Sequence, residues 1–402
     1  MKIAIITPIL YDEKSPFNHL FKDILEGWLN AGHEVVRIVA CENITDENYK
    51  MGIESDNISY IPVQRKKAKK SNIIVRYLRD TWTNIRMARM LKKLKDIDIL
   101  FEDVSYSSYW SIREAKKKKL RVISMLQDVW PDNAVASGLI SNGGLVYNFF
   151  EGWQKKVYKK SDKIVCISDD MKAFIVGKDV PEEKIDVIYN WGYTDETVDI
   201  PWSENAFVQK YQLDKNLFYA VYAGNIGRMQ NVELIIRAAD RLQDEEDIRF
   251  LIIGDGVNRE NIEKLVGEMK LKNVMFLPMQ PSEMATSIYS AASVNIIPLV
   301  EGGVNTALPS KTGVVLSCGR PTIFCFGENT RFGKHLQEMR GGFAVSSLDD
   351  ETLKNLIVAL KNEEVGIEQK SIRKMFKTYF CKNKNIEKYK EILMDEKVVN
   401  NG

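Results

Sequence analysis

Stretches with the character of buried β-strands alternate with stretches of helical periodicity along almost the whole chain. Residues 2–7 form the first strand candidate, and Ser15 and Pro16 then provide a good helix start, because serine can cap a helix and proline suits its first position. Gly32 ends this helix, and residues 34–40 form the next strand. Strands buried on both faces and separated by crossover helices predict an α/β protein with parallel sheets of the Rossmann type.

The alternation runs through two cycles. In the first cycle, further strands are predicted at residues 59–63, 98–102, 121–126, 163–168 and 186–189, and helices at about 73–94, 108–118 and 145–160. In the second cycle, strands are predicted at residues 217–223, 249–253, 274–277, 294–298 and 321–326, and helices at about 231–243, 258–268, 282–290, 311–318, 330–339 and 350–362. Ligands of such sheets bind at the carboxyl ends of the strands, so we expect the site in the cleft between the two halves.

Interruptions of this periodicity divide the chain. They predict one Rossmann-like domain at residues 1–190 and a second at residues 216–370, with an interdomain connection over residues 191–215. The stretch at residues 371–402 is expected to supply one C-terminal helix that packs back on the first domain. A chain of 402 residues agrees with this division, since domains usually have roughly 100–200 residues.

The composition narrows the class of protein. Apolar residues make up 45% of the chain and charged residues 28%, which favours a large buried core over disorder. The 57 Lys and Arg nearly balance the 55 Asp and Glu, and a net charge of +2 gives no support to a protein that coats nucleic acid. Five cysteines without a CxxC pair predict neither a disulfide framework nor a zinc site, and they favour a reducing compartment.

The chain offers no candidate for membrane insertion or secretion. No apolar run reaches about 18 residues, so no membrane span is expected. The apolar stretch at residues 2–7 is too short and too early for a signal peptide. These observations predict a cytoplasmic protein.

A glycine-containing loop follows the first strand of the second half. Residues 224–228 read GNIGR, and glycines at positions 224 and 227 would let the backbone approach a phosphate at the start of the next helix. Arg228 could add a bidentate contact to a diphosphate. The alternative is a tight turn with a surface arginine. The loop is not GxGxxG, and no acidic residue at the expected strand end supports a nicotinamide cofactor.

Two further loops of the second half have a similar character. Gly254, Asp255 and Gly256 end the next strand, although ordinary turn chemistry also explains this sequence. Residues 300–312 bring Gly, Thr, Ser and Lys together just before a helix start, which suits an anion through backbone N–H groups, hydroxyls and one ammonium. The alternative for this loop is a capped surface turn. Two such loops in one half favour an anion site.

The first half carries acidic residues at strand ends. Asp128 follows a predicted strand and would face the cleft, with Trp130 and Pro131 forming a rigid wall beside it. A capping role for Asp128 in the following turn is an open alternative. Glu102 and Asp103 close another strand and could line an acceptor pocket, but they could equally cap the loop that follows.

Three histidines are too few and too scattered for a histidine-rich metal site. His19 lies on the first predicted helix and could face the cleft. His33 falls in a turn between helix and strand, and His335 falls on a late helix at the surface. We therefore expect no metal site.

Taken in order, the motifs resemble one family. The segments that carry the resemblance are 128–131 (DVWP), 161–168 (SDKIVCIS), 184–191 (KIDVIYNW), 224–228 (GNIGR), 253–256 (IGDG), 308–311 (LPSK) and 318–323 (CGRPTI). They occur in the same order, over about 200 residues, as in the retaining, nucleotide-sugar-dependent glycosyltransferases of family four, which have the GT-B fold. The chain looks most similar to bacterial transferases of surface polysaccharide synthesis, including the L-fucosamine transferase-like group.

The resemblance implies a function. A sugar, hexosyl or N-acetylhexosaminyl, would move from a nucleoside diphosphate donor, a UDP-sugar, to a hydroxyl of a glycan acceptor that is lipid-linked, with anomeric configuration retained. The first domain would hold the acceptor and the second the donor, and closure across the connection would exclude water. The nucleotide-sugar is a substrate, so no cofactor is expected. Cations and backbone N–H groups can stabilise the departing diphosphate without a metal.

The resemblance also assigns roles to residues. The catalytic set would be Asp128, Arg228 and Lys311, with Asp128 at the acceptor hydroxyl or the transferred sugar and the two cations at the diphosphate. The donor-binding residues would be Gly224, Asn225, Gly227, Gly254, Thr306, Leu308 and Ser310. The acceptor-binding residues would be His19, Glu102 and Trp130.

The chain departs from the family pattern at defined positions. The family has two glutamates eight positions apart, and the corresponding residues here are Thr306 and Val314; Glu301 does not restore the spacing. A family lysine after the phosphate-binding arginine is replaced by Glu233, so Lys311 is the best candidate for the missing charge. The missing glutamates motivate an alternative, a non-catalytic GT-B subunit that binds and stabilises a partner transferase. A third possibility, a sugar-nucleotide epimerase, would need an acid–base set that the cleft-facing residues do not supply.

The near-neutral total hides an uneven distribution of charge. Residues 1–190 hold 31 Lys and Arg against 26 Asp and Glu, whereas residues 191–402 hold 26 against 29. Within residues 51–121 the count is 18 against 8, a net of +10. Solvated surface explains part of this, but a basic acceptor domain also suits an anionic bilayer and predicts a peripheral position on the inner face of the plasma membrane. Residues 146–150 and Trp153, followed by four lysines up to position 160, could add an amphipathic contact.

Overall fold

The computed structural model describes residues 1–7, 17–45, 47–66, 73–192, 195–198 and 200–395, and it divides into two compact units. Unit 1 contains residues 1–135, 140–189 and the stretch from Asn383 onward. Unit 2 contains residues 136–139 and 190–382. The Ser15–Pro16 helix start and the lysines between 67 and 70 lie outside the described residues.

Unit 1 is built on a parallel sheet of seven strands in the order β3-β2-β1-β4-β5-β6-β7. The strands are β1 (Lys2–Thr7), β2 (Glu34–Cys41), β3 (Ile58–Gln64), β4 (Ile99–Asp103), β5 (Arg121–Leu126), β6 (Lys163–Cys166) and β7 (Ile185–Val187). The central strand β1 places Ile3 opposite Val35 of β2 and opposite Ile99 of β4. The chain therefore reverses its direction of travel across the sheet between β1 and β4, which is where such sheets form ligand sites.

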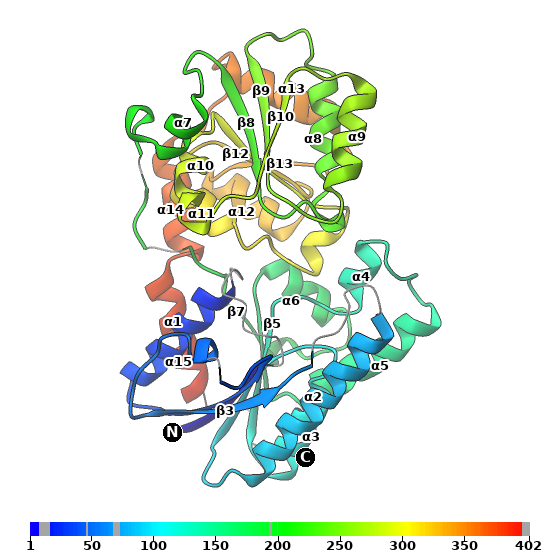
Figure 1. Ribbon diagram of the computed structural model, residues 1–402, viewed down its shortest axis with the longest axis vertical. Coiled ribbons are helices and arrows are strands. Elements are labelled where there is room, and N and C mark those ends of the chain that lie inside the picture. The colour runs from blue at the N-terminus through cyan, green and yellow to red at the C-terminus, as the bar shows by residue number, and fades with distance from the viewer. Residues whose placement is uncertain (8–16, 46, 67–72, 193–194, 199, 396–402) are drawn as a thin grey trace. The chain divides into compact units, whose positions relative to one another are not determined.

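Helices cover the sheet of unit 1 (Figure 1). They are α1 (Phe17–Asn30), α2 (Ile73–Lys93), α3 (Tyr109–Lys117), α4 (Asp132–Ala136), α5 (Leu145–Lys160), α6 (Asp169–Val176) and α15 (Lys382–Met394). Helices α2, α3 and α5 lie together, and α1 lies beside α15 (Figure 1). The ring of Trp28 on α1 meets Phe101 of β4 edge to face at 4.9 Å, and its Nε1 donates a hydrogen bond of 3.1 Å to the Tyr389 carbonyl of α15. The C-terminal helix is thus part of the core of unit 1.

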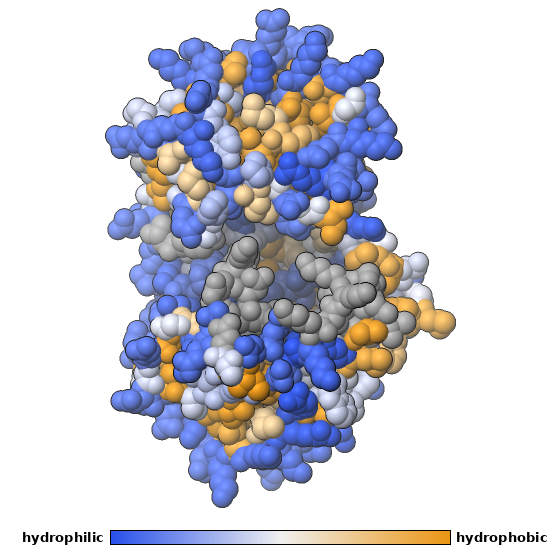
Figure 2. All heavy atoms as spheres, in the orientation of Figure 1, coloured by the Kyte–Doolittle hydropathy of each residue, from blue (hydrophilic) through white to orange (hydrophobic). Residues whose placement is uncertain are grey.

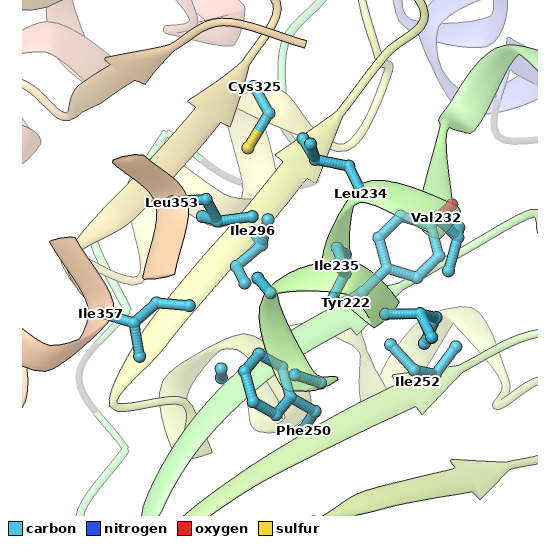
Figure 3. Packing of buried hydrophobic residues seen from close by; sticks show 14 of the residues in the cluster. Tyr222, Val232, Leu234, Ile235, Phe250, Ile252, Ile296, Cys325, Leu353 and Ile357 are labelled. Carbon is cyan, nitrogen blue, oxygen red and sulfur yellow. The ribbon is translucent and has the colours of Figure 1, made fainter. Parts of the chain in front are cut away.

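Unit 2 is built on a second parallel sheet, of six strands in the order β10-β9-β8-β11-β12-β13. Its strands are β8 (Phe218–Ala223), β9 (Ile248–Ile253), β10 (Val274–Leu277), β11 (Val294–Pro298), β12 (Thr322–Cys325) and β13 (Phe343–Val345). Its helices are α7 (Ala206–Tyr211), α8 (Val232–Asp240), α9 (Arg259–Met269), α10 (Ala285–Ala291), α11 (Thr312–Ser317), α12 (Arg331–Met339), α13 (Asp350–Lys361) and α14 (Gln369–Tyr379). Figure 3 shows Ile235 of α8, Ile296 of β11 and Leu353 of α13 within one buried cluster that joins helices to the sheet.

The prediction of two Rossmann-like domains with parallel sheets is confirmed, and two local expectations need correction. The stretch at residues 371–402, predicted to supply one C-terminal helix, contains parts of two in its described residues, because the helix breaks at residues 380–381. Helix α14 belongs to unit 2, and only α15 packs on unit 1 as expected. The predicted connection over residues 191–215 is not all linker, since α7 packs on α10 within unit 2. Short elements such as α6 and β13 were not predicted. Within the described ranges, no helix is both long and apolar enough to cross a membrane.

Candidate functional site

The loops of unit 2 that contain the glycine motifs meet at one edge of the sheet. Strand β8 lies between β9 and β11, so the chain order reverses at β8 and the loops after β8 and β11 flank that point. The loop after β9 also reaches them: the Ile226 amide donates a 2.8 Å hydrogen bond to the Asp255 carbonyl. The Val300 amide donates to the Met229 carbonyl at 2.9 Å and ties in the loop after β11. Three separate sequence motifs therefore form one structural feature.

Glycine is required where these loops touch. A Cβ atom on Gly254 would lie 1.8 Å from the Gly224 carbonyl oxygen, and a Cβ on Gly256 would lie 2.4 Å from the Ile226 oxygen. Both glycines also have φ angles, +148° and +158°, in the region that other residues rarely adopt. The two loops are consequently held backbone against backbone, and Arg259 fixes their base by donating to the Gly254 and Leu277 carbonyls.

The Lys311 ammonium lies against the loop after β8. Its Nζ donates a 2.7 Å hydrogen bond to the Ala223 carbonyl and lies 4.0 Å from the centroid of the Tyr222 ring. A Cβ added to Gly224 would come within 2.8 Å of this nitrogen, so the ammonium is in contact with the loop backbone. Loss of hydration lowers the pKa of Lys311 to about 7. An arriving anion would favour the charged form and restore the positive charge.

Two tyrosines position this lysine, and no sequence motif contains both of them. Tyr222 provides the ring under the ammonium, and burial raises its pKa well above the usual range. The Tyr289 hydroxyl donates a 3.2 Å hydrogen bond to the same Ala223 carbonyl that accepts from Lys311. In sequence both residues look like ordinary aromatic members of a strand and a helix, so no local pattern indicated them.

The other predicted donor-binding residues fall into two groups. Asn225, Arg228 and Ser310 are exposed at the loops, and Arg228 forms no ion pair with a described residue. Thr306 and Leu308 are buried at 3% and 6% exposure, and the Thr306 hydroxyl donates to the Gly303 carbonyl at 3.1 Å. Their side chains support the loop from inside, so a direct donor contact by these two side chains is not favoured by their placement.

The position where the family has a second cation is occupied by a bonded acid. Glu233 on α8 accepts a 2.6 Å hydrogen bond from the Asn258 side-chain amide, which links α8 to the start of α9. Lys311 comes from the loop after β11, and its ammonium lies against the β8 loop, on which Arg228 also stands.

Unit 1 presents carboxylates at the corresponding strand ends. Glu102 is fully enclosed, and its Oε1 accepts a 2.8 Å hydrogen bond from the Ser111 hydroxyl of α3. Its Oε2 has no hydrogen-bond partner in the described part of the chain. Burial raises the pKa of Glu102 to about 8, so the protonated form dominates at neutral pH. The expected acceptor contact by Glu102 needs correction, because the side chain is sealed under α3 and carries little charge.

Asp103 and Asp128 lie closer to the open end of the sheet. Asp103 is 1% exposed, and burial together with the nearby negative charge of Asp128 raises its pKa to about 7. Asp128 is itself exposed, two residues beyond the end of β5. Of the carboxylates predicted in unit 1, Asp128 is thus the exposed one, while Asp103 is enclosed at the end of β4.

An aromatic wall stands beside Asp128. The ring of Trp130 lies 5.3 Å from Phe150 of α5 and 5.8 Å from Tyr106. Its Nε1 is enclosed and has no hydrogen-bond partner among the residues that the structure describes. Phe150, which lies behind this wall, is 8% exposed. The half-buried His19 lies on the first turns of α1 in the same unit.

The described residues offer no cluster of three or more His, Cys, Asp or Glu side chains that could hold a metal ion. What the two units offer instead is a cationic loop site in one and an acidic strand edge in the other. The first can bind a phosphate group, and the second can hold or accept a proton.

Two family models match successive parts of the chain. Residues 19–195 match the family model described as Glycosyltransferase Family 4, and residues 203–308 match the model described as Glycosyl transferases group 1. The chain is 26% identical over 250 residues to the putative colanic acid biosynthesis glycosyl transferase WcaI of Escherichia coli K12, a match that covers 61% of each chain. The chain therefore spans about three fifths of the length of this relative.

Two solved structures share the fold over nearly their full length. The Anabaena protein HepE, crystallised with UDP, superposes with a TM-score of 0.70 at 12% identity, covering 98% of this chain and all of HepE. A sucrose-phosphate synthase from Thermosynechococcus elongatus superposes with a TM-score of 0.73 at 15% identity and covers 98% of both chains. At these identities the likeness establishes the fold, which is that of the GT-B glycosyltransferases.

Proposed function

Since the chain joins a Glycosyltransferase Family 4 domain to a Glycosyl transferases group 1 domain in a GT-B fold, we propose that it is a retaining glycosyltransferase. The donor is a UDP-sugar, and the acceptor is a hydroxyl of a lipid-linked glycan in bacterial surface polysaccharide synthesis. The name of the E. coli relative supports the pathway class, and the UDP complex of Anabaena HepE supports the nucleotide.

One observation carries the proposal. The Lys311 ammonium lies against the Gly224 loop, at the point of the unit 2 sheet where ligand sites form. The exposed Arg228 stands on the same loop and can meet a second phosphate oxygen. This combination suits a diphosphate, whose negative charge grows as it departs.

The chemistry follows from that charge. The bond between the anomeric carbon and the diphosphate oxygen breaks, and Lys311 and Arg228 stabilise the oxygen that takes up the electron pair. The acceptor oxygen forms the new bond on the same face of the sugar, and its proton passes to the departing phosphate. Asp128 holds the acceptor hydroxyl or the transferred sugar, so no residue of the protein needs to act as a nucleophile. Trp130 provides an apolar wall for the acceptor.

The direct test is release of nucleoside diphosphate. Purified protein is mixed with a panel of nucleotide sugars and with lipid-linked or soluble acceptors, and products are read by mass spectrometry. We expect turnover with a UDP-sugar only when an acceptor is present. Asp128→Asn should lower the turnover by about 10²-fold while leaving UDP binding unchanged, because the carboxylate that positions the acceptor or the transferred sugar is lost.

A second function is favoured by one observation. The positions of the family's two glutamates are occupied by Thr306 and Val314, which are buried at 3% and 5% exposure and offer no carboxylate. A non-catalytic subunit that stabilises a partner transferase would tolerate this loss. No binding of a nucleoside diphosphate, together with a stable complex with another transferase, would favour the subunit; UDP binding and turnover favour the enzyme.

A further inference from the structure

Two helices of unit 1 expose apolar side chains on a shared face. On α2, Leu78 and Trp82 are 60% and 56% exposed and stand one turn apart. On α5, Leu145, Val146 and Phe149 are 91%, 52% and 49% exposed. Figure 2 shows hydrophobic side chains gathered around the segment that leads into α5. We call these five residues the α2–α5 face.

The two helices are joined by ring contacts, so their exposed side chains form one surface. The ring of Tyr77 on α2 meets Phe149 edge to face at 6.0 Å and Phe150 at 5.0 Å. Phe150 in turn contacts Trp130 at 5.3 Å. The face is therefore continuous with the aromatic wall next to Asp128.

Helices α2 and α5 carry many cations beside the exposed apolar side chains, and their few acidic side chains are largely buried. Helix α2 contains six Lys or Arg, and helix α5 contains four Lys. The two helices together contain two acidic residues. Both acids are turned inward and paired: Asp80 with Arg65 at 2.7 Å, and Glu151 with Lys178 at 3.1 Å. Among the described side chains of the two helices, every exposed charged one is thus a cation.

Individual cations lie over aromatic rings of these helices. The Arg89 guanidinium lies 5.5 Å from the Trp82 ring, and the Lys156 ammonium lies 5.0 Å from the Trp153 ring. Aromatic rings with neighbouring cations are typical of surfaces at the boundary between lipid and water, where the rings enter the headgroup layer and the cations meet phosphates.

We propose that the α2–α5 face, with its lysines at residues 155, 156 and 159, docks on a bilayer that contains anionic lipids. This deepens the proposed function, because a lipid-linked acceptor would then be presented beside Trp130 and Asp128. A second copy of the chain does not suit the face, since an isologous contact would bring like charges together. A neutral protein groove would leave the cations without partners.

The test is flotation with vesicles, without donor or acceptor. Vesicles of phosphatidylcholine with about one third phosphatidylglycerol are compared with vesicles of phosphatidylcholine alone, at low and high salt. We expect binding to the anionic vesicles that weakens with salt. Leu78→Glu with Trp82→Glu should lower the bound fraction by about tenfold or more, because apolar contact is lost and a like charge is added.

Two variants complete the design. Lys155→Gln, Lys156→Gln and Lys159→Gln together should weaken binding and flatten its salt dependence, whereas Leu348→Glu, at an exposed leucine of unit 2, should leave binding unchanged. Brominated lipid should quench the wild-type tryptophan fluorescence more than that of a Trp82→Phe variant, which shows that the ring enters the bilayer. Undiminished binding of the double glutamate variant, equal binding to neutral vesicles, or dimerisation without lipid binding would overturn the proposal. Sugar transfer to a soluble acceptor is measured separately, so either proposal can fail alone.

Discussion

The two units have the same architecture and opposite chemistry at their strand ends. Unit 1 belongs largely to the half of the chain with excess positive charge, yet its β4 end carries Glu102 and Asp103. Unit 2 belongs to the half with excess negative charge, yet its β8 and β11 loops carry Lys311 and Arg228. The sign of the charge at these strand ends thus differs from the sign of the net charge of each half. The ends of the strands decide which ligand chemistry each sheet can serve.

The difference also extends to how each edge is built. In unit 2, loops approach through backbone at Gly224 and Gly254, which leaves N–H groups and cations available. In unit 1, side chains rather than backbone fill the edge, and their carboxyls are held in surroundings that favour the proton. A phosphate needs fixed positive charge, whereas an acceptor hydroxyl needs a group that can share a proton. Four measurements test this contrast.

The largest effect is expected for the cation of unit 2. Lys311→Ala removes the ammonium at the β8 loop and should lower turnover by about 10²–10³-fold, roughly 2.7–4 kcal/mol of barrier. Release of nucleoside diphosphate measures it. Lys311→Arg is the matched control and should retain part of the activity because it keeps the charge. Full turnover by Lys311→Ala would remove the phosphate role assigned to this residue.

Next in size is the backbone contact between the loops. Gly254→Ala places a Cβ 1.8 Å from the Gly224 oxygen and should lower the free energy of unfolding of unit 2 by about 3 kcal/mol, with weaker UDP binding. Gly267→Ala on α9 is the control, since nothing lies within 4 Å of its Cβ position and alanine favours a helix. Chemical denaturation compares the two. Equal stability of both variants would show that the loops are not interlocked.

The acidic edge should respond to pH. The raised pKa of Asp103, about 7, means that the folded state holds a proton that the unfolded state releases between about pH 4 and 7, so stability falls as the pH rises through that window. Asp103→Asn should remove this loss. The difference in free energy of unfolding between the variant and the wild type should therefore rise by on the order of 2 kcal/mol from pH 4 to pH 8. Urea unfolding of unit 1 at the two pH values measures it, with Glu260→Gln on α9 as control. The same pH dependence of stability in the wild type and in Asp103→Asn would contradict a raised pKa of Asp103.

The smallest effect concerns the protonation of Lys311. Its pKa near 7 in the free protein predicts that diphosphate binding takes up a proton above neutral pH, and that affinity falls by at most about tenfold per pH unit above 7. Calorimetry of UDP binding at pH 8, in buffers of different ionisation enthalpy, measures the uptake. Lys311→Arg should bind without that proton. Absence of uptake by the wild type would show that the lysine is already charged.

Much of the fold follows from periodicity. Strand and helix positions in both cycles lie close to those observed, because buried parallel strands and crossover helices leave clear patterns; the predicted strands at residues 121–126 and 274–277 match β5 and β10. Short elements escaped prediction. Helix α7 has six residues and β13 has three, too few for a period to show. The division of the C-terminal stretch between two units also leaves no periodic trace, because both helices are amphipathic.

The candidate site was only partly predictable. Motifs after strands indicated Asp128, Arg228 and Lys311, since loops at carboxyl ends are where ligands bind. Sequence could not show that Glu102 is sealed under α3, that Thr306 faces inward, or that two tyrosines position the lysine. These facts depend on side-chain direction and on contacts between residues far apart in the chain.

The position of helix α15 late in the chain has a consequence for how the protein folds during synthesis. Helix α15 supplies the partner of the Trp28 indole, and Arg121 donates hydrogen bonds of 2.8 Å to the Ile392 and Leu393 carbonyls of the same helix. These residues follow the whole of unit 2 in the chain, so they leave the ribosome after it. Unit 1 is therefore completed after unit 2, although its synthesis begins earlier. Until α15 is made, the part of the unit 1 core around Trp28 lacks its covering helix, whereas unit 2 can already fold. Chaperone dependence should accordingly concentrate on unit 1, and a nascent chain stalled before residue 383 should expose it.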